Sequence, residues 1–577
     1  MAGASSPTED MLAERARGTV DVQALCEMLN GGKARLARRQ YLSVLLQKQP
    51  WSDKTPRPFL SRTDYHVAAL DASFRLRDLV LEHGLSGEDY HYLRTLLDFP
   101  GGLELHYGMY IPTLQSQATD EQKEKYLRCP GGPPGPAPAA APPPPPPPPA
   151  QRRHAPMRPR PPPAPRRPAL EFKEIGTYAQ TELGHGTFLR GLETTATYDA
   201  ESEEFVLHSP TLTATKWWPG GLGKTATHAV VMARLFLKGR DHGPHPFVVR
   251  LRCAATHLPR RGVVVGDIGP KLGYNGVDNG FLRFDHLRVP RDALLAKYSG
   301  VTRAGDYVPP PPENSKAVYG TMMYIRATIV EGAGHFLSRG VTIATRYCAV
   351  RRQTAPARGE RETTVLDYQN VQWALLRLLA SSYALYFQGQ AMMRLYNRFE
   401  ADRERGDFSI LPELHPYSSG LKAVTSWMAA DGIEECRRTC GGQGFSVLSG
   451  LPQLLASYVQ NCTWEGDNNV MCLQMSRFLV KQMHSHLSRP GEAVTGQCAY
   501  FADRSPPPPA PDAGVPGLLR MLQVAAAALA KKSLAMVQPT PGAGEPSLPG
   551  RRGAGGAGRG SPRPPLGAAR GPWPSSP

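Results

Sequence analysis

The stretch Tyr178-Ala-Gln-Thr-Glu-Leu-Gly-His-Gly186 opens the part of the chain that decides the fold class. Around it, residues 171–300 hold short runs of β-branched and aromatic residues bounded by Gly, Asp or Pro, which predict strands. These runs are Phe205-Val-Leu-His208, Ala229-Val-Val-Met-Ala-Arg-Leu-Phe-Leu237, Phe247-Val-Val-Arg-Leu251 and Gly262-Val-Val-Val-Gly266. We therefore expect a β-barrel or β-sandwich domain in the middle of the chain.

Helical patterns flank this β domain on both sides. Apolar residues recur three and four positions apart, and Thr119 followed by acidic residues marks a helix start. The stretches that we expect to be helical are 21–29, 63–76, 119–127, 324–347, 371–387 and 421–430. The three long stretches after the β domain favour an antiparallel helix bundle.

The expected fold class is therefore α+β multidomain. Going along the chain, we expect an N-terminal α-helical domain, a Pro/Arg-rich low-complexity insertion, a central β domain, a C-terminal helix bundle and a truncated second helical region that is mostly disordered. Their expected bounds are 10–129, 130–168, 169–310, 311–488 and 489–577. Within the last region, 518–532 has the pattern of an amphipathic helix, and the sequence from 539 onward is typical of disorder.

The net charge of +17 invites a nucleic-acid-binding interpretation, but the charge is unevenly spread. Residues 130–168 contain six arginines, no acid and 20 prolines, and residues 541–577 contain five arginines and one glutamate. These two segments supply ten of the seventeen charges and have few apolar residues to bury. Nucleic-acid binding is therefore disfavoured, whereas the Pro-rich segment leaves open docking to an SH3- or WW-type domain.

Several site classes are not expected from the sequence. Nine cysteines without a Cys-x-x-Cys pair argue against a disulfide framework and against a structural metal site, and we expect no metal. No apolar run approaches the ~18 residues of a membrane span. Glycine-rich dinucleotide and phosphate loops, the Gly-x-Ser-x-Gly elbow and His-Glu-x-x-His are also missing from the sequence.

Five long blocks carry a more specific signal. They are Tyr178 to Gly186 continuing through Arg190-Gly-Leu-Glu-Thr-Thr-Ala-Thr-Tyr198, Lys216-Trp-Trp-Pro-Gly-Gly-Leu-Gly-Lys224, Asp278-Asn-Gly-Phe-Leu-Arg-Phe-Asp-His-Leu-Arg-Val-Pro-Arg291, Cys440-Gly-Gly-Gln-Gly-Phe445 and Cys462-Thr-Trp-Glu-Gly-Asp-Asn468. In these blocks the chain resembles the acyl-CoA oxidases, a family within the acyl-CoA dehydrogenase superfamily. The resemblance runs in order from about residue 10 to about residue 488.

The resemblance implies that FAD binds between the β domain and the helix bundle. Thr181 matches the family's threonine that meets the flavin, and Gly220 matches a glycine near the same ring. Arg351 and Gln353 match the position that grips the FAD pyrophosphate of a neighbouring subunit, and Gly442 matches a turn at the adenine end. A homodimer that shares its cofactor is therefore expected. Each residue taken singly also has an ordinary interpretation, such as a strand hydroxyl, a turn or a solvated helix end.

Glu465 matches the family's catalytic base, which removes a proton next to the thioester carbonyl of a fatty acyl-CoA. The resemblance implies that a hydride then leaves the next carbon for the flavin, and that oxygen receives the electrons and becomes hydrogen peroxide. Burial should raise the pKa of such a carboxylate towards the working pH. Without the resemblance, Glu465 could equally be an acid that caps the helix at 470–479.

Two alternatives to an oxidase stay open at this point. One is a dehydrogenase that passes its electrons to an electron-transfer flavoprotein, although the first two blocks are of oxidase type. The other is an inactive isoform that only dimerises or binds partners, which the retained Glu465 argues against. His185 is interpreted as structural or as lining the site. The resemblance implies a peroxisome, and Pro574-Ser-Ser-Pro577 does not have the form of a peroxisomal import tripeptide.

Overall fold

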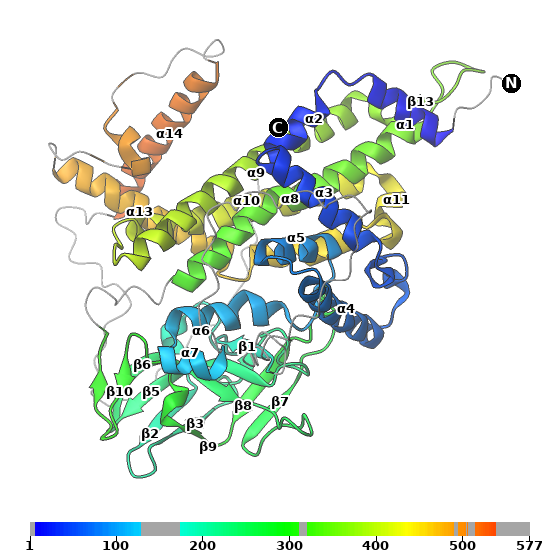
Figure 1. The fold of residues 1–577 in the computed structure, drawn as a ribbon. Helices are drawn as coiled ribbons and strands as arrows, with labels where there is room; N and C mark the ends of the chain where they lie inside the picture. The colour runs from blue at the N-terminus through cyan, green and yellow to red at the C-terminus, as the bar shows by residue number, and fades with distance from the viewer. Residues whose placement is uncertain are drawn as a thin grey trace, which may run out of the picture. The chain divides into compact units, whose positions relative to one another are not determined.

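The computed structural model describes most of the chain as two compact units (Figure 1). The described residues are 6–127, 174–310, 320–489, 494, 496–503, 505 and 514–537. Unit 1 comprises residues 1–476, and unit 2 comprises residues 477–577. The insertion predicted at 130–168 and the disorder predicted from 539 lie outside the described residues.

Unit 1 begins with the expected helical domain. Its helices are α1 (Pro7–Ala16), α2 (Val22–Asn30), α3 (Lys33–Gln47), α4 (Arg62–Glu82), α5 (Gly87–Leu97), a π-helical turn (His106–Tyr110), α6 (Ile111–Gln117) and α7 (Asp120–Tyr126). The helix start predicted at Thr119 is confirmed, because its hydroxyl accepts a hydrogen bond from the Gln122 amide in a capping box. Gly31, with a φ of +77°, ends α2.

The central domain consists of two main sheets packed over one core. The strands of the larger sheet are β1 (Gly176–Ala179), β2 (Thr195–Asp199), β3 (Glu204–His208), β5 (His228–Leu237), β6 (Arg240–Arg250) and β9 (Leu287–Pro290). The smaller sheet contains β4 (Lys216–Trp217), β7 (Val263–Asp267) and β8 (Gly280–Phe284), and β10 (Gly300–Val301) pairs with β11 (Tyr307–Val308) beside them. Phe205, Phe247 and Leu282 from both sheets are fully buried in one cluster, which makes the domain a β-sandwich.

Long helices form the second helical part of unit 1. They are α8 (Gly320–Val350), α9 (Gln369–Glu404) and α10 (Leu411–Thr439), followed by the shorter α11 (Gly441–Phe445) and α12 (Leu451–Tyr458), while β12 (Arg352–Gln353) and β13 (Thr363–Thr364) pair between α8 and α9. Leu337, Leu378 and Ile433, one from each long helix, lie in one buried cluster. The bundle expected from the sequence is therefore present.

Unit 2 contains the predicted amphipathic helix. α13 (Asn468–Ser488) leads into this unit, and α14 (Gly514–Val537) covers the predicted stretch 518–532. Ala530 and Leu534 of α14 are buried with Met483, whereas Leu522 stays exposed. Among the described residues no helix is long and apolar enough to cross a membrane.

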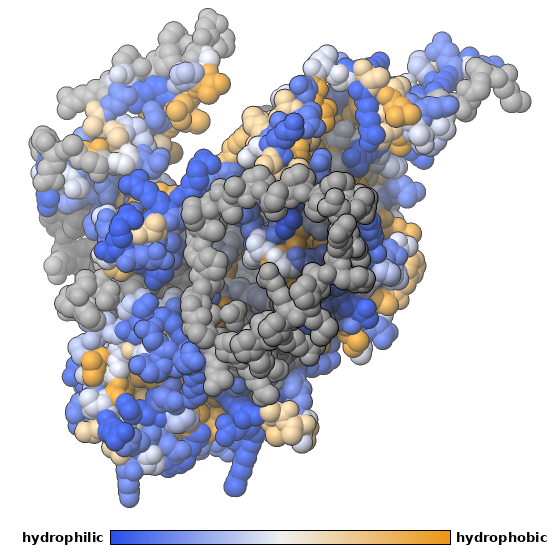
Figure 2. Space-filling model, viewed as in Figure 1, coloured by the Kyte–Doolittle hydropathy of each residue, from blue (hydrophilic) through white to orange (hydrophobic). Residues whose placement is uncertain are grey.

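Hydrophobic side chains also remain on the surface of unit 1. Figure 2 shows them scattered among polar ones over its helices. Trp373 and Leu376 on α9 and Phe445 in α11 are among the most exposed large apolar side chains. Such exposure is typical of a surface that meets another protein chain or domain.

Of the described strands, the sequence analysis missed nine: β1, β2, β4, β8, β9 and the two-residue strands β10 to β13. β1 has the sequence Gly-Thr-Tyr-Ala and β4 only two residues, so neither offers the alternation on which strand prediction depends. β1 nevertheless pairs in parallel with β5, Gly176 opposite His228. Its position depends on tertiary contacts, and these contacts bring it to the site described below.

Gly176 fixes β1 against the N-terminal helical domain. The Gly176 amide donates to His106 Nδ1 at 2.9 Å, and a Cβ at this position would lie 2.1 Å from Cγ of the buried Tyr110 ring. Both partners come from the π-helical turn. Only glycine therefore lets the first strand approach the helical domain this closely.

The Gly176→Ala variant should be clearly less stable than the parent chain. The added methyl group overlaps a fully buried ring, and such overpacking costs about 1–3 kcal/mol. The matched control is Gly300→Ala in β10, where a Cβ would meet nothing within 4 Å. Thermal unfolding of the two purified variants measures the difference. Equal thermal midpoints for both variants would show that β1 accommodates the added methyl group without loss of stability.

Candidate active site

Glu465 lies in a strained turn that joins α12 to α13. Its φ is +56° and that of the following Gly466 is +109°, so both residues adopt backbone conformations that L-residues avoid. A non-glycine residue with positive φ is maintained only where the surrounding structure enforces it, and such residues gather at functional sites. The turn therefore needs contacts that hold it.

Two buried cations from the long helices supply these contacts. Arg326 of α8 donates from Nε to the Glu465 carbonyl oxygen at 3.1 Å and from Nη1 to the Ser419 hydroxyl at 3.2 Å. Lys422 of α10 donates from Nζ to the Gly466 carbonyl oxygen at 2.7 Å and to Asn468 Oδ1 at 2.8 Å. Burial lowers the pKa of Lys422 to about 8. Both cations bind the backbone of the turn and leave the Glu465 side chain free.

The Glu465 carboxylate is available for chemistry. Within the described residues it has no hydrogen-bond or ion-pair partner, and the side chain is half-buried. Burial raises its pKa above the ordinary value, while the charges of Arg326 and Lys422 oppose that rise. A carboxylate with a raised pKa and no partner is suited to act as a general base.

The alternative role of Glu465 as a helix cap is filled by another residue. α13 begins at Asn468, and the Asp467 side chain accepts a hydrogen bond from the Asn469 amide at 2.9 Å. The Asp467 carbonyl oxygen also accepts from Met471 N. Asp467 therefore caps the helix, and Glu465 lies outside the cap.

β1 brings the predicted flavin contacts close to Glu465. The Thr177 hydroxyl donates to the Gly220 carbonyl oxygen at 2.7 Å. The pKa of the next residue, Tyr178, is raised first by burial and then by the negative charge of Glu465, which places the two side chains within electrostatic reach. Thr181 follows two residues after the strand. β1 thus gathers Thr181, Gly220 and Glu465 around one end of the β domain.

Thr181 and Gly220 present a polar group and a closely packed backbone. In the part of the chain that the structure describes, the Thr181 hydroxyl has no hydrogen-bond partner, and its carbonyl oxygen accepts from Trp217 N. A Cβ at Gly220 would lie 2.9 Å from Val277 Cγ1, and one at Gly221 would lie 2.5 Å from Gly102 O. The two glycines are thus required by packing within the protein, and the unpartnered Thr181 hydroxyl fits a cofactor that needs a hydrogen-bond partner at its polar edge.

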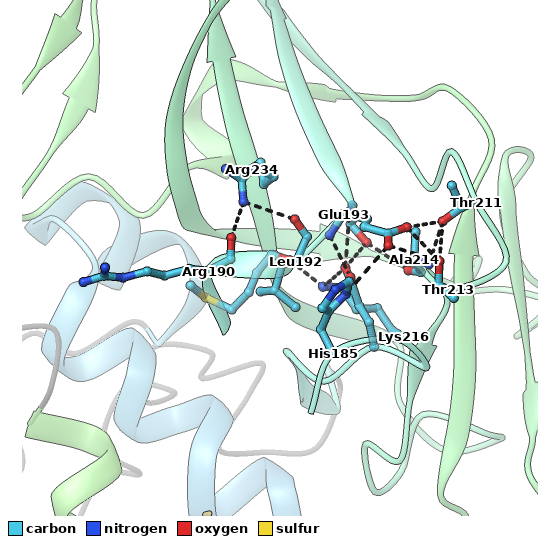
Figure 3. Close-up of polar contacts among 12 residues, drawn as sticks. His185, Arg190, Leu192, Glu193, Thr211, Thr213, Ala214, Lys216 and Arg234 are labelled. Carbon is cyan, nitrogen blue, oxygen red and sulfur yellow. Dashed lines mark hydrogen bonds and ion pairs between the residues drawn. The ribbon is translucent and has the colours of Figure 1, made fainter. Parts of the chain in front are cut away.

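A buried ion pair connects the first two sequence blocks (Figure 3). Lys216 Nζ lies 2.9 Å from Glu182 Oε1, and neither side chain is exposed. The same carboxylate accepts hydrogen bonds from the amides of Glu193 and Thr194 and from the Thr194 hydroxyl. Burial by itself raises the pKa of Glu182. Lys216 and these donors lower the pKa by more than burial raises it, so the pKa of Glu182 lies below its ordinary value. Burial lowers the pKa of Lys216 to about 8, and Glu182 opposes this change.

Figure 3 shows His185 close to Lys216 and Glu193. Its Nδ1 is 3.6 Å from Glu182 Oε2 and 3.8 Å from Glu193 Oε1. The location agrees with a structural role for His185, which was one of the two roles predicted from the sequence.

The remaining predicted residues lie at the far end of the bundle. Arg351 and Gln353 directly follow α8, and Gly442 lies in α11 directly after α10. The Cys348 thiol of α8 lies 3.9 Å from the Thr439 carbonyl oxygen of α10, so these two helix ends are adjacent. Arg351 is exposed and has no ion pair among the described residues, and a Cβ at Gly442 would meet nothing within 4 Å. The structure thus gathers these three residues apart from Glu465.

Helix geometry gives the separation between the two groups. Arg326, which holds the Glu465 turn, and Val350 at the end of α8 are separated along one continuous helix. At 1.5 Å per residue, that distance is about 36 Å. The predicted site residues therefore form two separate groups in one chain.

Sequence reasoning missed the residues that support the site. Arg326, Lys422, Glu182 and Lys216 were quoted within longer stretches but not assigned a role. The sequence did offer one indication of this support, which is Lys422 within the largely apolar stretch 421–430. A cation that is buried in such a helix needs a partner.

Three family models match the chain in the order of its domains. "Acyl-coenzyme A oxidase N-terminal" matches residues 21–129, "Acyl-CoA dehydrogenase, middle domain" matches 177–287, and "Acyl-CoA oxidase, C-alpha1 domain" matches 319–480. Together with the observed fold they define a protein of the acyl-CoA dehydrogenase and oxidase superfamily.

Individual relatives narrow this class. The chain is 41% identical to rat peroxisomal acyl-coenzyme A oxidase 1 over 86% of its length and 69% of that protein's. For the Arabidopsis thaliana protein of the same name the identity is 42%, over 85% and 68%. Among solved structures, Arabidopsis thaliana acyl-CoA oxidase 1 has a TM-score of 0.80 and 40% identity, covering 91% of this chain and 75% of that one. The chain belongs to the acyl-CoA oxidase family.

A further solved relative contains ligands. Caenorhabditis elegans acyl-CoA oxidase-1, crystallised with FAD and ATP, has a TM-score of 0.79 and 35% identity, covering 93% of this chain and 75% of that one. FAD is thus a ligand of a close structural neighbour.

The Lys216→Met variant should be strongly destabilised. It leaves the Glu182 carboxylate buried without its cation, and breaking such a pair costs about 3–5 kcal/mol. The matched control is Lys224→Met, because Lys224 is half-exposed and lies 3.9 Å from its nearest acid, Asp267. Thermal unfolding should show a large loss for the first variant and little for the second. A double variant that also carries Glu182→Gln should recover part of the loss, and equal midpoints for both single variants would contradict this role.

Proposed function

We propose that this chain is an FAD-dependent acyl-CoA oxidase that converts an acyl-CoA and O2 into trans-2-enoyl-CoA and H2O2. This reaction is the first step of fatty acid β-oxidation. The observation that carries the proposal is the Glu465 carboxylate, which has a raised pKa, no partner among the described residues and a turn held by two buried cations. The family membership described above supports the oxidase reaction.

Glu465 is the proposed base for the first half of the reaction. It accepts the proton from the carbon next to the thioester carbonyl, and the electron pair of that C–H bond becomes part of the new double bond. Arg326 and Lys422 fix the backbone of the turn, so the carboxylate starts from a defined position. A pre-positioned base reduces the entropy cost of proton transfer.

FAD is the proposed cofactor, with Thr181 and Gly220 near the flavin and Arg351, Gln353 and Gly442 near the other end. When bound, FAD accepts the hydride that leaves the next carbon and passes the electron pair to oxygen. The unpartnered Thr181 hydroxyl supplies a donor or acceptor, and the unpaired Arg351 guanidinium suits phosphate oxygens. These features support the fit of the cofactor to the residues of this chain.

A homodimer is proposed because the two groups of residues are too far apart to serve one cofactor within one chain. About 36 Å of α8 separates Arg326, which holds the Glu465 turn, from Val350, the residue before Arg351. Thr181 and Gly220 of one subunit would therefore hold the flavin end, while Arg351, Gln353 and Gly442 of the second subunit hold the pyrophosphate and adenine. The exposed apolar side chains on α9 and α11 also support contact with a second chain.

A fatty acyl-CoA is the proposed substrate, and the peroxisome is the proposed location. Both proposals rest on the names of the relatives, which are peroxisomal acyl-coenzyme A oxidases. A dehydrogenase that uses an electron-transfer flavoprotein shares the proton step, and the oxidase relatives favour oxygen as the acceptor.

The purified chain reconstituted with FAD should show a flavin spectrum and form peroxide from palmitoyl-CoA under air. Glu465→Gln should keep the flavin and lose nearly all peroxide formation, because the amide cannot accept the proton. Glu331→Gln is the matched control, since burial also raises the pKa of this α8 glutamate, which hydrogen-bonds to Gln390.

Three results would argue against the oxidase. A chain that cannot be reconstituted with flavin would contradict the cofactor assignment. Full peroxide formation by Glu465→Gln would contradict the role of the base. Substrate-dependent bleaching of the flavin without peroxide under air would point to the dehydrogenase.

Arg326 should set the pH dependence of the reaction. The base acts when deprotonated, so kcat/KM rises with pH through the pKa of Glu465. The Arg326 cation lowers that pKa, and its removal in Arg326→Gln should move the acidic limb of the profile to higher pH. Arg326→Lys keeps the charge and should leave the limb near that of the parent chain. An acidic limb of the kcat/KM profile that does not move in Arg326→Gln would show that the Arg326 charge does not act on Glu465.

A further inference from the structure

Three potential metal-binding side chains meet at one edge of the β domain, outside the site described above. His208 ends β3, and Asp285 and His286 form the turn between β8 and β9. Leu207 pairs with Leu287 in the antiparallel ladder of β3 and β9, so His208 and His286 face each other at the next position. Their rings stack with centroids 3.9 Å apart and 23° between the planes.

The ligand atoms of these residues are close together. One atom from each side chain can be chosen so that all three lie within 4.8 Å of one another. His286 Nδ1 is 2.8 Å from Asp285 Oδ1, so the two side chains of the turn already lie side by side. His208 Nδ1 is buried and has no hydrogen-bond partner. A buried polar atom without a partner is costly, and a bound cation would satisfy it.

We propose that His208, Asp285 and His286 form a binding site for a divalent transition metal such as Zn²⁺. Imidazole nitrogen and carboxylate oxygen are ligands that Zn²⁺ takes, at about 2.0–2.2 Å in tetrahedral geometry. Metal binding requires the exposed Asp285 and His286 side chains to rotate out of the present arrangement, in which the two imidazole rings are stacked. Three protein ligands leave the fourth position to water.

The backbone around the site is already in place. The Ser209 amide donates to the Phe284 carbonyl oxygen at 2.9 Å, and the Phe284 amide donates to the Ser209 hydroxyl at 3.1 Å. These bonds tie the end of β3 to the end of β8 next to all three ligands. His208 thus lies on a paired strand, and Asp285 and His286 lie in a two-residue turn between two paired strands.

One neighbouring charge works against the metal. Arg283 of β8 lies within electrostatic reach of the Asp285 carboxylate. Its positive charge weakens the attraction of that carboxylate for a second cation, so the two imidazoles carry most of the affinity. Removing the charge should therefore tighten metal binding.

The bound metal would tether the β8–β9 turn to the end of β3. After β3 the chain runs through residues 209–215 to Lys216, whose ion pair with Glu182 is buried in the domain. The metal is thus a stabilising element of the β domain. The proposal is independent of the oxidase reaction, and its ligands are not part of the proposed active site.

Metal binding to the full chain can be measured after treatment with a chelator. Titration with Zn²⁺ should give one site, a rise of about 2 °C or more in the thermal midpoint, and with Co²⁺ the visible absorption of a tetrahedral complex. His208→Gln, Asp285→Asn and His286→Gln should each weaken binding at least about tenfold. Arg283→Gln should strengthen it.

Control variants separate this site from other surface ligands. Cys253→Ser removes an exposed thiol and His83→Ala an exposed imidazole elsewhere, and both should bind the metal like the parent chain. Thermal midpoints without metal show that each variant is folded. Absence of saturable binding, or loss of binding only in the controls, would overturn the proposal, as would ligand variants that bind with the affinity of the parent chain.

Discussion

Glu182 and Lys216 are buried together where the two blocks of the β domain meet, and the geometry of the proposed site depends on this pair. Each charge would be costly alone, so the two segments must come together for either to be buried. The bridge between Glu182 and Lys216 places Thr181 beside Trp217, and the same segment continues to Gly220. Thr181 and Gly220, the flavin contacts predicted from the sequence, thus belong to the two segments that the Glu182–Lys216 ion pair joins.

A second constraint acts from the helix bundle and follows the same logic. Arg326 and Lys422 are buried cations whose donors are satisfied largely by carbonyl oxygens of the turn that carries Glu465. Their charges also oppose the effect of burial on that carboxylate. The β domain and the bundle therefore position different parts of the proposed site, and Tyr178 of β1 lies within electrostatic reach of Glu465.

Fold class and domain order could be predicted because periodicity and composition are local properties. The long helices followed from apolar spacing, as in 324–347 and 371–387, and the helix start at Thr119 followed from its cap. β1 and β4 were missed because their pairing depends on distant partners. For the site, the resemblance indicated Glu465 and the flavin residues, whose roles remain predictions, as do the exact domain bounds. The supporting cations could not be predicted, because nothing local shows that Lys422 will meet a turn more than forty residues away.

In the turn at Glu465, the contacts that hold the backbone are distinct from the side chain that is proposed to react. Arg326 and Lys422 bind only main-chain oxygens and the Asn468 side chain there, so the contacts that hold the turn do not involve the side chain of residue 465. A change of that side chain can therefore alter reactivity while the architecture persists. Evolution could retire or retune such a centre in a single substitution, and the resulting protein would still fold and assemble as its active ancestor did.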